Sequence, residues 1–288
     1  MRLALGTVQF GLAYGVANKS GQINSADASE ILQRAHAAGI DTLDTAIAYG
    51  ESEAMLGAVG VDQWKVVSKL PALPANCDDI VSWVRSEVAD SLARLKIPKL
   101  HALLLHRSQD LLTTHGDVLY SALTELKIDG LVAKVGLSIY GPEELELVYT
   151  KFPLDLVQSP FNVFDRRLLN SGWLDRLHHA GTEVHVRSVF LQGLLLLPAK
   201  ERQAEFAPWQ DLWSKWDSWL RGKELTPLQA SLIFALSRPE IDRVVVGVDG
   251  VSHLAEILSV PTTDPIYFPN SLESSDLSLI NPTKWRQQ

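Results

Sequence analysis

The sequence predicts a single α/β domain of 288 residues, folded as a (β/α)8 TIM barrel. Short apolar runs rich in Val and Leu alternate with longer amphipathic stretches, which is the pattern of parallel strands buried on both faces and joined by helices. The chain holds eight such runs, and one barrel of this kind typically occupies about 250 residues. We prefer a closed barrel to an open doubly wound sheet because the chain lacks an early Gly-x-Gly-x-x-Gly turn.

Each predicted strand is short and apolar, as expected for a barrel wall. The predicted strands are Leu3–Gly6, Thr42–Asp44, Lys65–Ser68, Ala102–Leu105, Ala133–Leu137, Leu154–Val157, Glu183–Val186 and Arg243–Val246.

Helical spacing of apolar residues fills the segments between strands. Ser25 is predicted to cap a first helix that stops at Gly39, and Asp78 to cap a second that ends before Pro98. The pair Thr226-Pro227 is typical of a helix N-cap followed by proline at the first helical position. Further helices are predicted at Gly116–Ile128, Pro142–Tyr149, Leu168–Ala180, Pro227–Leu236 and Ser252–Leu258.

Two regions depart from the alternation: a Trp-rich insertion at about 198–224 and an irregular Pro- and Ser-rich tail at about 260–288. The insertion follows the seventh strand, where a loop would overhang the mouth of the barrel. Its indoles are spaced to share one helical face, which indicates packing of a helix onto the barrel, with stacking on a sugar or an aromatic ligand as the alternative. These residues are Trp209, Trp213, Trp216 and Trp219.

The bulk properties exclude several classes of protein. The formal net charge of −8 argues against a nucleic-acid-binding surface, which needs a concentrated basic face. The one cysteine, Cys77, excludes an intramolecular disulfide and fits a reducing compartment. No apolar run is long enough for a membrane span or a signal-peptide core. We therefore expect a cytoplasmic protein without nucleic-acid or membrane partners, either a monomer or a small homo-oligomer.

Polar residues at the carboxyl ends of the strands are the first catalytic candidates, because barrel enzymes build their active sites there. Asp44 ends the second predicted strand, and Lys69 and His106 follow the third and the fourth. Tyr49 lies in the loop after Asp44. The remaining histidines show no metal-ligand spacing, so we expect no metal site.

The chemistry of these four side chains is coherent. A carbonyl that accepts a hydride builds negative charge on its oxygen, and an acid must protonate or stabilise that oxygen. Tyr49 is the predicted proton donor. Lys69 supplies the positive charge that makes a phenol a better acid, and Asp44 holds Lys69 in place. His106 can donate a hydrogen bond to the carbonyl oxygen and orient it.

The segments Asp41–Gly50, Val67–Lys69 and Leu103–His106 resemble the aldo-keto reductase family, and the similarity extends roughly from Leu3 to Leu258. The resemblance implies a (β/α)8 barrel that reduces aldehydes or ketones with NADPH or, in some members, NADH. The family's catalytic Asp, Tyr, Lys and His correspond here to Asp44, Tyr49, Lys69 and His106.

The resemblance also implies contacts with the cofactor. Arg187 stands where the family places an aromatic that stacks on the nicotinamide, and Phe190 is a candidate substitute. In the loop after the eighth strand, a natural anion site at a helix N-terminus, His253 replaces the usual arginine. Because the family as a whole favours NADP(H), the resemblance implies NADP(H) rather than NAD(H) as the cofactor of this chain, with NAD(H) as the alternative. The implied cofactor-binding residues are Ser138, Gln158, Ser188, Phe190, Gly247, Val248, Asp249, Ser252, His253 and Glu256, and the expected substrate pocket contains Gln9, Phe10 and Tyr14.

Two other functions stay open on the residues alone. Barrel aldolases form a Schiff base through a strand-borne lysine, and Lys69 or Lys134 could serve in such a lyase. A regulatory module that binds the cofactor but turns over slowly is the second alternative. The sequence does not identify the carbonyl substrate.

Overall fold

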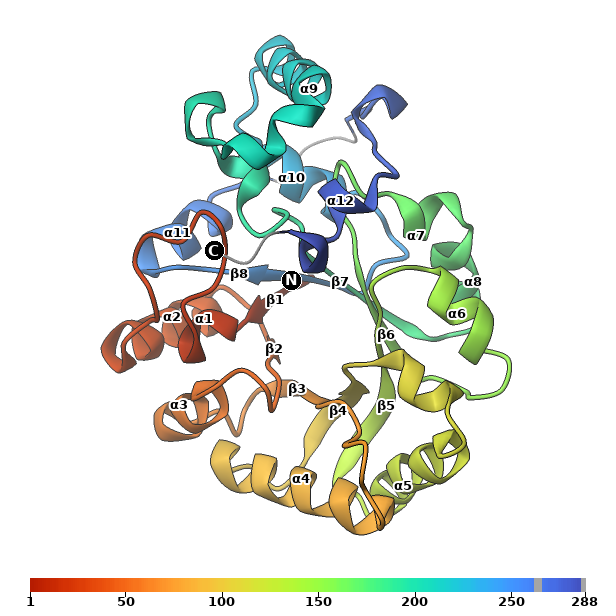
Figure 1. Cartoon of the computed structure of the whole chain (residues 1–288). Coiled ribbons are helices and arrows are strands. Elements are labelled where there is room, and N and C mark those ends of the chain that lie inside the picture. The colour runs from red at the N-terminus through yellow and green to blue at the C-terminus, as the bar shows by residue number, and fades with distance from the viewer. Residues whose placement is uncertain (262–265, 286–288) are drawn as a thin grey trace.

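The computed structural model describes residues 1–261 and 266–285. Within them, eight parallel strands close into a barrel in chain order, so the predicted fold class is confirmed (Figure 1). All eight predicted strands are present, and their ends differ from the prediction by at most three residues. The strands are β1 (Leu3–Gly6), β2 (Thr42–Asp44), β3 (Lys65–Leu70), β4 (Leu100–Leu105), β5 (Val132–Ser138), β6 (Leu156–Pro160), β7 (Glu183–Arg187) and β8 (Arg243–Gly247).

The helices surround this ring of strands (Figure 1). A helix follows every strand, which gives the crossover that a parallel sheet requires. The helices are α1 (Val8–Gly11), α2 (Ser25–Ala37), α3 (Ser52–Val59), α4 (Ile80–Leu95), α5 (Gly116–Ile128), α6 (Glu143–Val148), α7 (Arg167–Asn170), α8 (Trp173–His179), α9 (Gln210–Lys223), α10 (Pro227–Leu236), α11 (Val251–Leu258) and α12 (Leu277–Ile280).

Three helix predictions need correction. The side chain of Asn24, rather than Ser25, caps α2 by accepting a hydrogen bond from the Asp27 amide. Asp79, rather than Asp78, caps α4 in the same way. The helix predicted over Leu168–Ala180 is two short helices, because Gly172 between them has a left-handed φ of 77° that a continuous helix does not allow.

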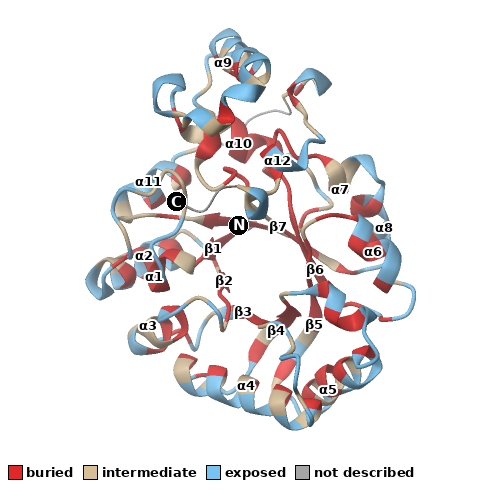
Figure 2. Ribbon diagram, in the orientation of Figure 1, coloured by how far each residue is buried: buried red, intermediate tan, exposed pale blue. Residues whose placement is uncertain are grey.

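The strands are buried along nearly their whole length, and the exposed residues lie on the outer faces of the helices (Figure 2). In the Trp-rich insertion, Trp213 and Trp216 are completely buried, and the Trp213 ring centroid lies 5.0 Å from that of Phe164. Trp209 precedes α9 and, like Trp219, is only partly buried. The inner indoles therefore pack the insertion onto the barrel, as expected for a structural role.

The described part of the tail is short helical turns joined by irregular chain: Asn270–Leu272, α12 and Pro282–Lys284. The prediction of an irregular tail also covers 262–265 and 286–288, which lie outside the described residues. In the ranges that are described, no helix has the length and apolar character needed to cross a membrane.

Candidate active site

A buried ion pair joins β2 and β3 at their carboxyl ends. The Lys69 ammonium lies 2.9 and 2.8 Å from the two carboxylate oxygens of Asp44, and it donates a third hydrogen bond to the Thr45 carbonyl at 2.8 Å. The side chains of Lys69 and Asp44 are only 1% and 6% exposed. Burial alone would lower the pKa of Lys69, but the charge and hydrogen bonds of Asp44, together with Tyr49, outweigh that effect and raise the pKa. Lys69 is therefore a permanent, enclosed positive charge.

Tyr49 and His106 lie beside this charge. The Lys69 ammonium is 5.0 Å from the centroid of the Tyr49 ring. The Tyr49 and His106 rings meet edge to face with their centroids 6.1 Å apart. Burial, followed by the positive charges of Lys69 and Arg187, lowers the pKa of His106 to about 4. At neutral pH His106 is thus uncharged, with one ring N–H left to donate a hydrogen bond.

The loop that carries Tyr49 is fixed by a close backbone approach. An added Cβ at Gly11 would overlap the Tyr49 carbonyl oxygen and crowd the Ser52 amide. Ser52 in turn donates a hydrogen bond to the Thr7 carbonyl at 2.8 Å. Only glycine at position 11 lets the loop after β1 touch the loop after β2, so this contact positions the phenol.

Two of the expected cofactor contacts lie behind the ion pair. The Gln158 amide donates to Asp44 at 2.6 Å, and the Ser138 hydroxyl donates to Gln158 at 3.3 Å. Both side chains are almost completely buried. In this structure Ser138 and Gln158 extend the hydrogen-bond network of Asp44 into the barrel.

Two adjoining cavities open at this end of the barrel. The catalytic cavity, of about 410 Å³, is lined by Asp44, Tyr49 and His106 from the predicted catalytic set, with Lys69 directly behind. The second, which we call the distal cavity, has a volume of about 520 Å³. Shared walls make the two cavities one elongated cleft; the residues that line both are Tyr14, Phe190, Gln192, Gly193 and Gly247.

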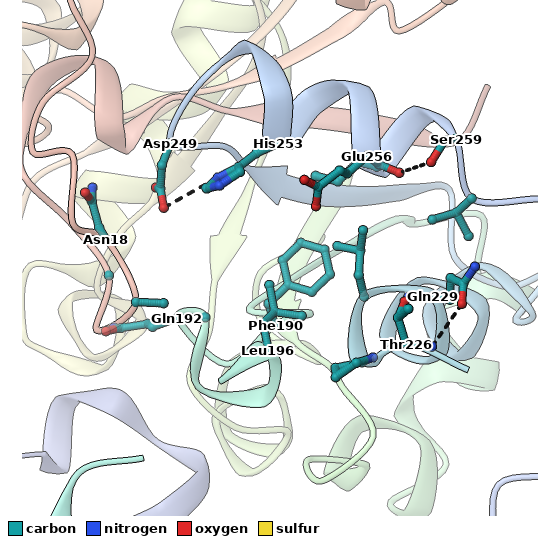
Figure 3. Close-up of a pocket in the computed structure, with 18 of the residues that line it drawn as sticks. Asn18, Phe190, Gln192, Leu196, Thr226, Gln229, Asp249, His253, Glu256 and Ser259 are labelled. Carbon is teal, nitrogen blue, oxygen red and sulfur yellow. Dashed lines mark hydrogen bonds and ion pairs between the residues drawn. The ribbon is translucent and has the colours of Figure 1, made fainter. Parts of the chain in front are cut away.

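The distal cavity lies between the helix after β8 and the start of α10 (Figure 3). Asp249, His253 and Glu256 come from the β8 loop and α11, and Asp249 lies 3.7 Å from the His253 ring. Thr226 and Gln229 face them from the first turn of α10, where they cap each other. No Lys or Arg lines this cavity within residues 1–261 and 266–285.

The remaining predicted site residues are distributed differently. Ser188, like Tyr14, lines the catalytic cavity. Phe10 is fully buried in the core and does not reach the cleft. Val248 is also buried, whereas Ser252 is exposed on the outer side of α11. Gln9 lies against Gly247 but lines neither cavity, and its Oε1 is a buried acceptor without a hydrogen-bond partner among the described residues.

Several cleft residues had no signal in the sequence. Tyr140 follows the end of β5 by two residues, and Pro282 and Thr283 reach the catalytic cavity from the tail. The wall between the cavities has left-handed backbone at Leu191 and Gln192, with φ of 49° and 53°. Such strain at residues other than glycine persists only where the surrounding fold enforces it, and it clusters at functional sites.

No group of three or more metal-ligating side chains suited to a metal ion occurs in the part of the chain that the structure describes. Lys134, the second lysine that a Schiff base could use, pairs with Glu183 near the amino ends of the strands, away from the cleft. Its neighbours His101 and His185 also contact Glu183.

Comparison with known proteins agrees with this geometry. The model of the aldo/keto reductase family matches residues 2–265. An aldo-keto reductase from Bacillus halodurans, in its holo form, superposes with a TM-score of 0.71 at 20% identity, over 92% of this chain and 88% of that one. A glycerol dehydrogenase from Gluconobacter oxydans superposes with a TM-score of 0.69 at 20% identity, over 91% and 87% of the two chains.

None of the curated proteins compared with the chain matches it. At 20% identity the two solved structures support the fold alone, whereas the family model covers nearly the whole chain. The chain therefore belongs to the aldo/keto reductase family and is an NAD(P)-dependent oxidoreductase.

Proposed function

We propose that the protein reduces an aldehyde or ketone, or oxidises the corresponding alcohol, with Tyr49 as the general acid. The observation that supports this most directly is the convergence of Tyr49 and His106 on one cavity wall, beside the enclosed charge of Lys69. Proton transfer from a positioned side chain contributes typically 10²–10⁴-fold to such a reaction.

The roles follow from the charges. The Lys69 ammonium favours the developing phenolate as Tyr49 gives its proton to the carbonyl oxygen. Asp44 keeps Lys69 charged through two hydrogen bonds. His106 is uncharged, so it donates a hydrogen bond to the same oxygen without competing as a source of protons. In the direction of alcohol oxidation each of these steps is reversed.

The cleft suits a nicotinamide dinucleotide, which supplies the hydride when bound. The two cavities form one elongated space that begins at Tyr49 and ends at Glu256. The buried, unpartnered Oε1 of Gln9 lies against Gly247, a residue that lines both cavities. Residues that would hold the far end of the dinucleotide are Thr226, Gln229, Asp249, His253 and Glu256.

The charge of the distal cavity favours NAD(H) over NADP(H), contrary to the expectation from the family as a whole. Carboxylates accept hydrogen bonds from a ribose diol and repel a 2′-phosphate, a principle well known from other dinucleotide sites. Asp249 and Glu256 supply two carboxylates, and no Lys or Arg of residues 1–261 and 266–285 lines the cavity to offset them. The Kd of each nucleotide can be measured by energy transfer from tryptophan to the reduced nicotinamide. NADH should bind more tightly than NADPH, and His253→Arg should reduce the ratio of the two Kd values.

The test of the reaction is steady-state oxidation of NADH and NADPH with a panel of aldehydes and ketones. Tyr49→Phe should abolish turnover while leaving nucleotide affinity within about twofold, since Phe keeps the ring and removes only the acid. Normal turnover by Tyr49→Phe would refute the mechanism. Tight nucleotide binding without turnover of any carbonyl by the wild type would instead favour a regulatory role.

A Schiff-base lyase is disfavoured by the state of Lys69. An amine must be unprotonated to attack a carbonyl, and Lys69 is fully buried, paired with Asp44 and has a raised pKa. Borohydride should therefore trap no covalent adduct between the protein and a carbonyl compound.

A further inference from the structure

Arg187 brings a second positive charge to the catalytic cavity. It is the last residue of β7, and its side chain lines the same cavity as Tyr49 and His106. The positive charge of Arg187 acts on His106, because it is one of the causes that lower the pKa of His106. Unlike Lys69, Arg187 has no carboxylate within 4.0 Å among residues 1–261 and 266–285.

The contacts of Arg187 leave several N–H donors of its guanidinium without a hydrogen-bond partner among the described residues. One Nη donates to the Ile139 carbonyl at 2.9 Å and the other to the Ser188 hydroxyl at 3.3 Å. The Tyr140 ring lies 5.1 Å from the Arg187 Cζ, so it supports one face of the guanidinium plane. A guanidinium carries five N–H donors. The described contacts therefore fix the orientation of Arg187 and leave donors for a ligand in the cavity.

Tyr14 adds a neutral donor to the same wall. Its hydroxyl accepts a hydrogen bond from Gln192 at 2.8 Å, which leaves its own proton free for another partner. Tyr14 is 40% exposed at the mouth of the cleft, and a phenol with a pKa near the ordinary value of about 10 stays protonated near neutral pH. A preorganised guanidinium and a phenol O–H in the lining of one cavity are suited to an anion, and arginine pairs with carboxylate or phosphate through two parallel hydrogen bonds.

We infer that the carbonyl substrate carries an anionic group, a carboxylate or a phosphate, which Arg187 binds while the carbonyl lies at Tyr49 and His106. This inference rests on the proposed reduction of a carbonyl and specifies its substrate class. The cavity of about 410 Å³ also has to hold the nicotinamide, so the space that remains admits only a small substrate. Because Arg187 and Tyr49 line the same cavity, the anion and the carbonyl lie in one compact compound.

The test compares matched neutral and anionic substrates. Unbranched ω-oxo acids of increasing chain length are measured against the unbranched aldehydes of the same length, and glyceraldehyde 3-phosphate against glyceraldehyde. The wild type should prefer the anionic member of at least one pair, and the chain length of the preferred acid reports the span from Arg187 to the reacting carbonyl. A preference confined to the phosphate pair would identify phosphate as the anion.

The variants separate anion recognition from other roles of Arg187. Arg187→Met should lower kcat/KM for the preferred anionic substrate about 10- to 100-fold, the range for losing a hydrogen-bonded charge. The loss on the neutral partner should be smaller, so the ratio of kcat/KM for the anionic substrate to kcat/KM for the neutral one should fall, and Arg187→Lys should recover part of that ratio. The matched control is Arg221→Met, an exposed arginine on α9 outside both cavities, which should leave both substrates unaffected.

Three results would overturn the inference. Equal preference of the wild type for neutral and anionic members of every pair would exclude an anion site. An equal loss on both members in Arg187→Met, with folding intact by circular dichroism, would assign Arg187 a positioning role for Tyr49 and His106. A weakened Kd for NADH or NADPH in Arg187→Met would assign it to the cofactor. Failure of the wild type to reduce any carbonyl compound would instead refute the proposed reaction itself.

Discussion

Removing the negative charge of Asp44 should destabilise the fold strongly. At 2.8 Å the Coulomb attraction between Lys69 and Asp44 is about 6 kcal/mol with an effective dielectric constant of 20. Asp44→Asn keeps the shape of the side chain and leaves the Lys69 ammonium buried without a counter-charge. Breaking a buried pair in this way typically costs about 3–5 kcal/mol, a large part of the total free energy of unfolding, about 5–15 kcal/mol.

The pH dependence of Asp44→Asn provides an internal check. Without its partner, burial should lower the pKa of Lys69 below the value in the unfolded chain. The unfolded state then binds more protons than the folded state, so the stability of the variant should rise with pH and its deficit should shrink toward pH 9.

The assay is urea unfolding followed by tryptophan fluorescence, with midpoint and slope compared among Asp44→Asn, Lys69→Met and the double variant. Because the double variant buries no isolated charge, it should be more stable than either single variant. Asp90→Asn, an exposed carboxylate on α4, is the control. Costs below about 1 kcal/mol for Asp44→Asn, or strict additivity in the double variant, would refute the picture of a tightly coupled buried pair.

Three further outcomes are expected. The pKa of His106 is about 4 in the folded protein and about 6.5 in the unfolded chain, so its contribution to stability is complete above pH 6.5. That contribution, about 3 kcal/mol, is lost as the pH falls toward 4. In urea unfolding measured over a series of pH values, His106→Gln should therefore show a smaller loss of stability on the acid side than the wild type. Gly11→Ala should cost about 1–3 kcal/mol in urea unfolding and should lower kcat by displacing the Tyr49 loop. The control Gly222→Ala, at an exposed position of α9 with open space around it, should leave kcat unchanged. Glu183→Gln removes the carboxylate shared by Lys134 and His185 and should cost about 3 kcal/mol without changing the nucleotide Kd, since Glu183 lies outside both cavities; a changed Kd would contradict that placement.

The strands and the four candidate catalytic residues could be predicted from the sequence because both depend on local pattern. Buried parallel strands are apolar throughout, and strand ends converge wherever a barrel closes. Asp44, Lys69 and His106 could therefore be placed together without knowledge of side-chain packing. The helix α3 was missed because it has only eight residues and contains Gly57, a weak helix former. That glycine is needed where the backbone of Arg94 approaches, a contact that no local pattern reveals.

The cleft was harder to predict because distant segments build it. Phe10 follows a strand end just as Tyr14 does, yet Phe10 points into the core and Tyr14 into the cleft. A helix of four residues is too short for the periodicity of its apolar residues to show which way a side chain faces. The sequence also did not indicate that two threonines line the cleft. Thr226 could be interpreted only as a helix cap, and Thr283 lies in a tail without periodicity.

The pairing of the first strand with the last has a consequence for folding. Leu5 of β1 is in register with Val246 of β8, so the ring stays open until nearly the whole chain has been synthesised. Bringing such distant segments together carries a large loop-closure entropy and slows folding. Gly247 ends β8 and the loop after it carries Asp249, so the distal cavity forms only with this last pairing. Until β1 and β8 pair, two sheet edges stay unpaired, and such edges are templates for aggregation. A nucleotide that binds the distal cavity binds only the closed ring, so it should shift the equilibrium away from the open form.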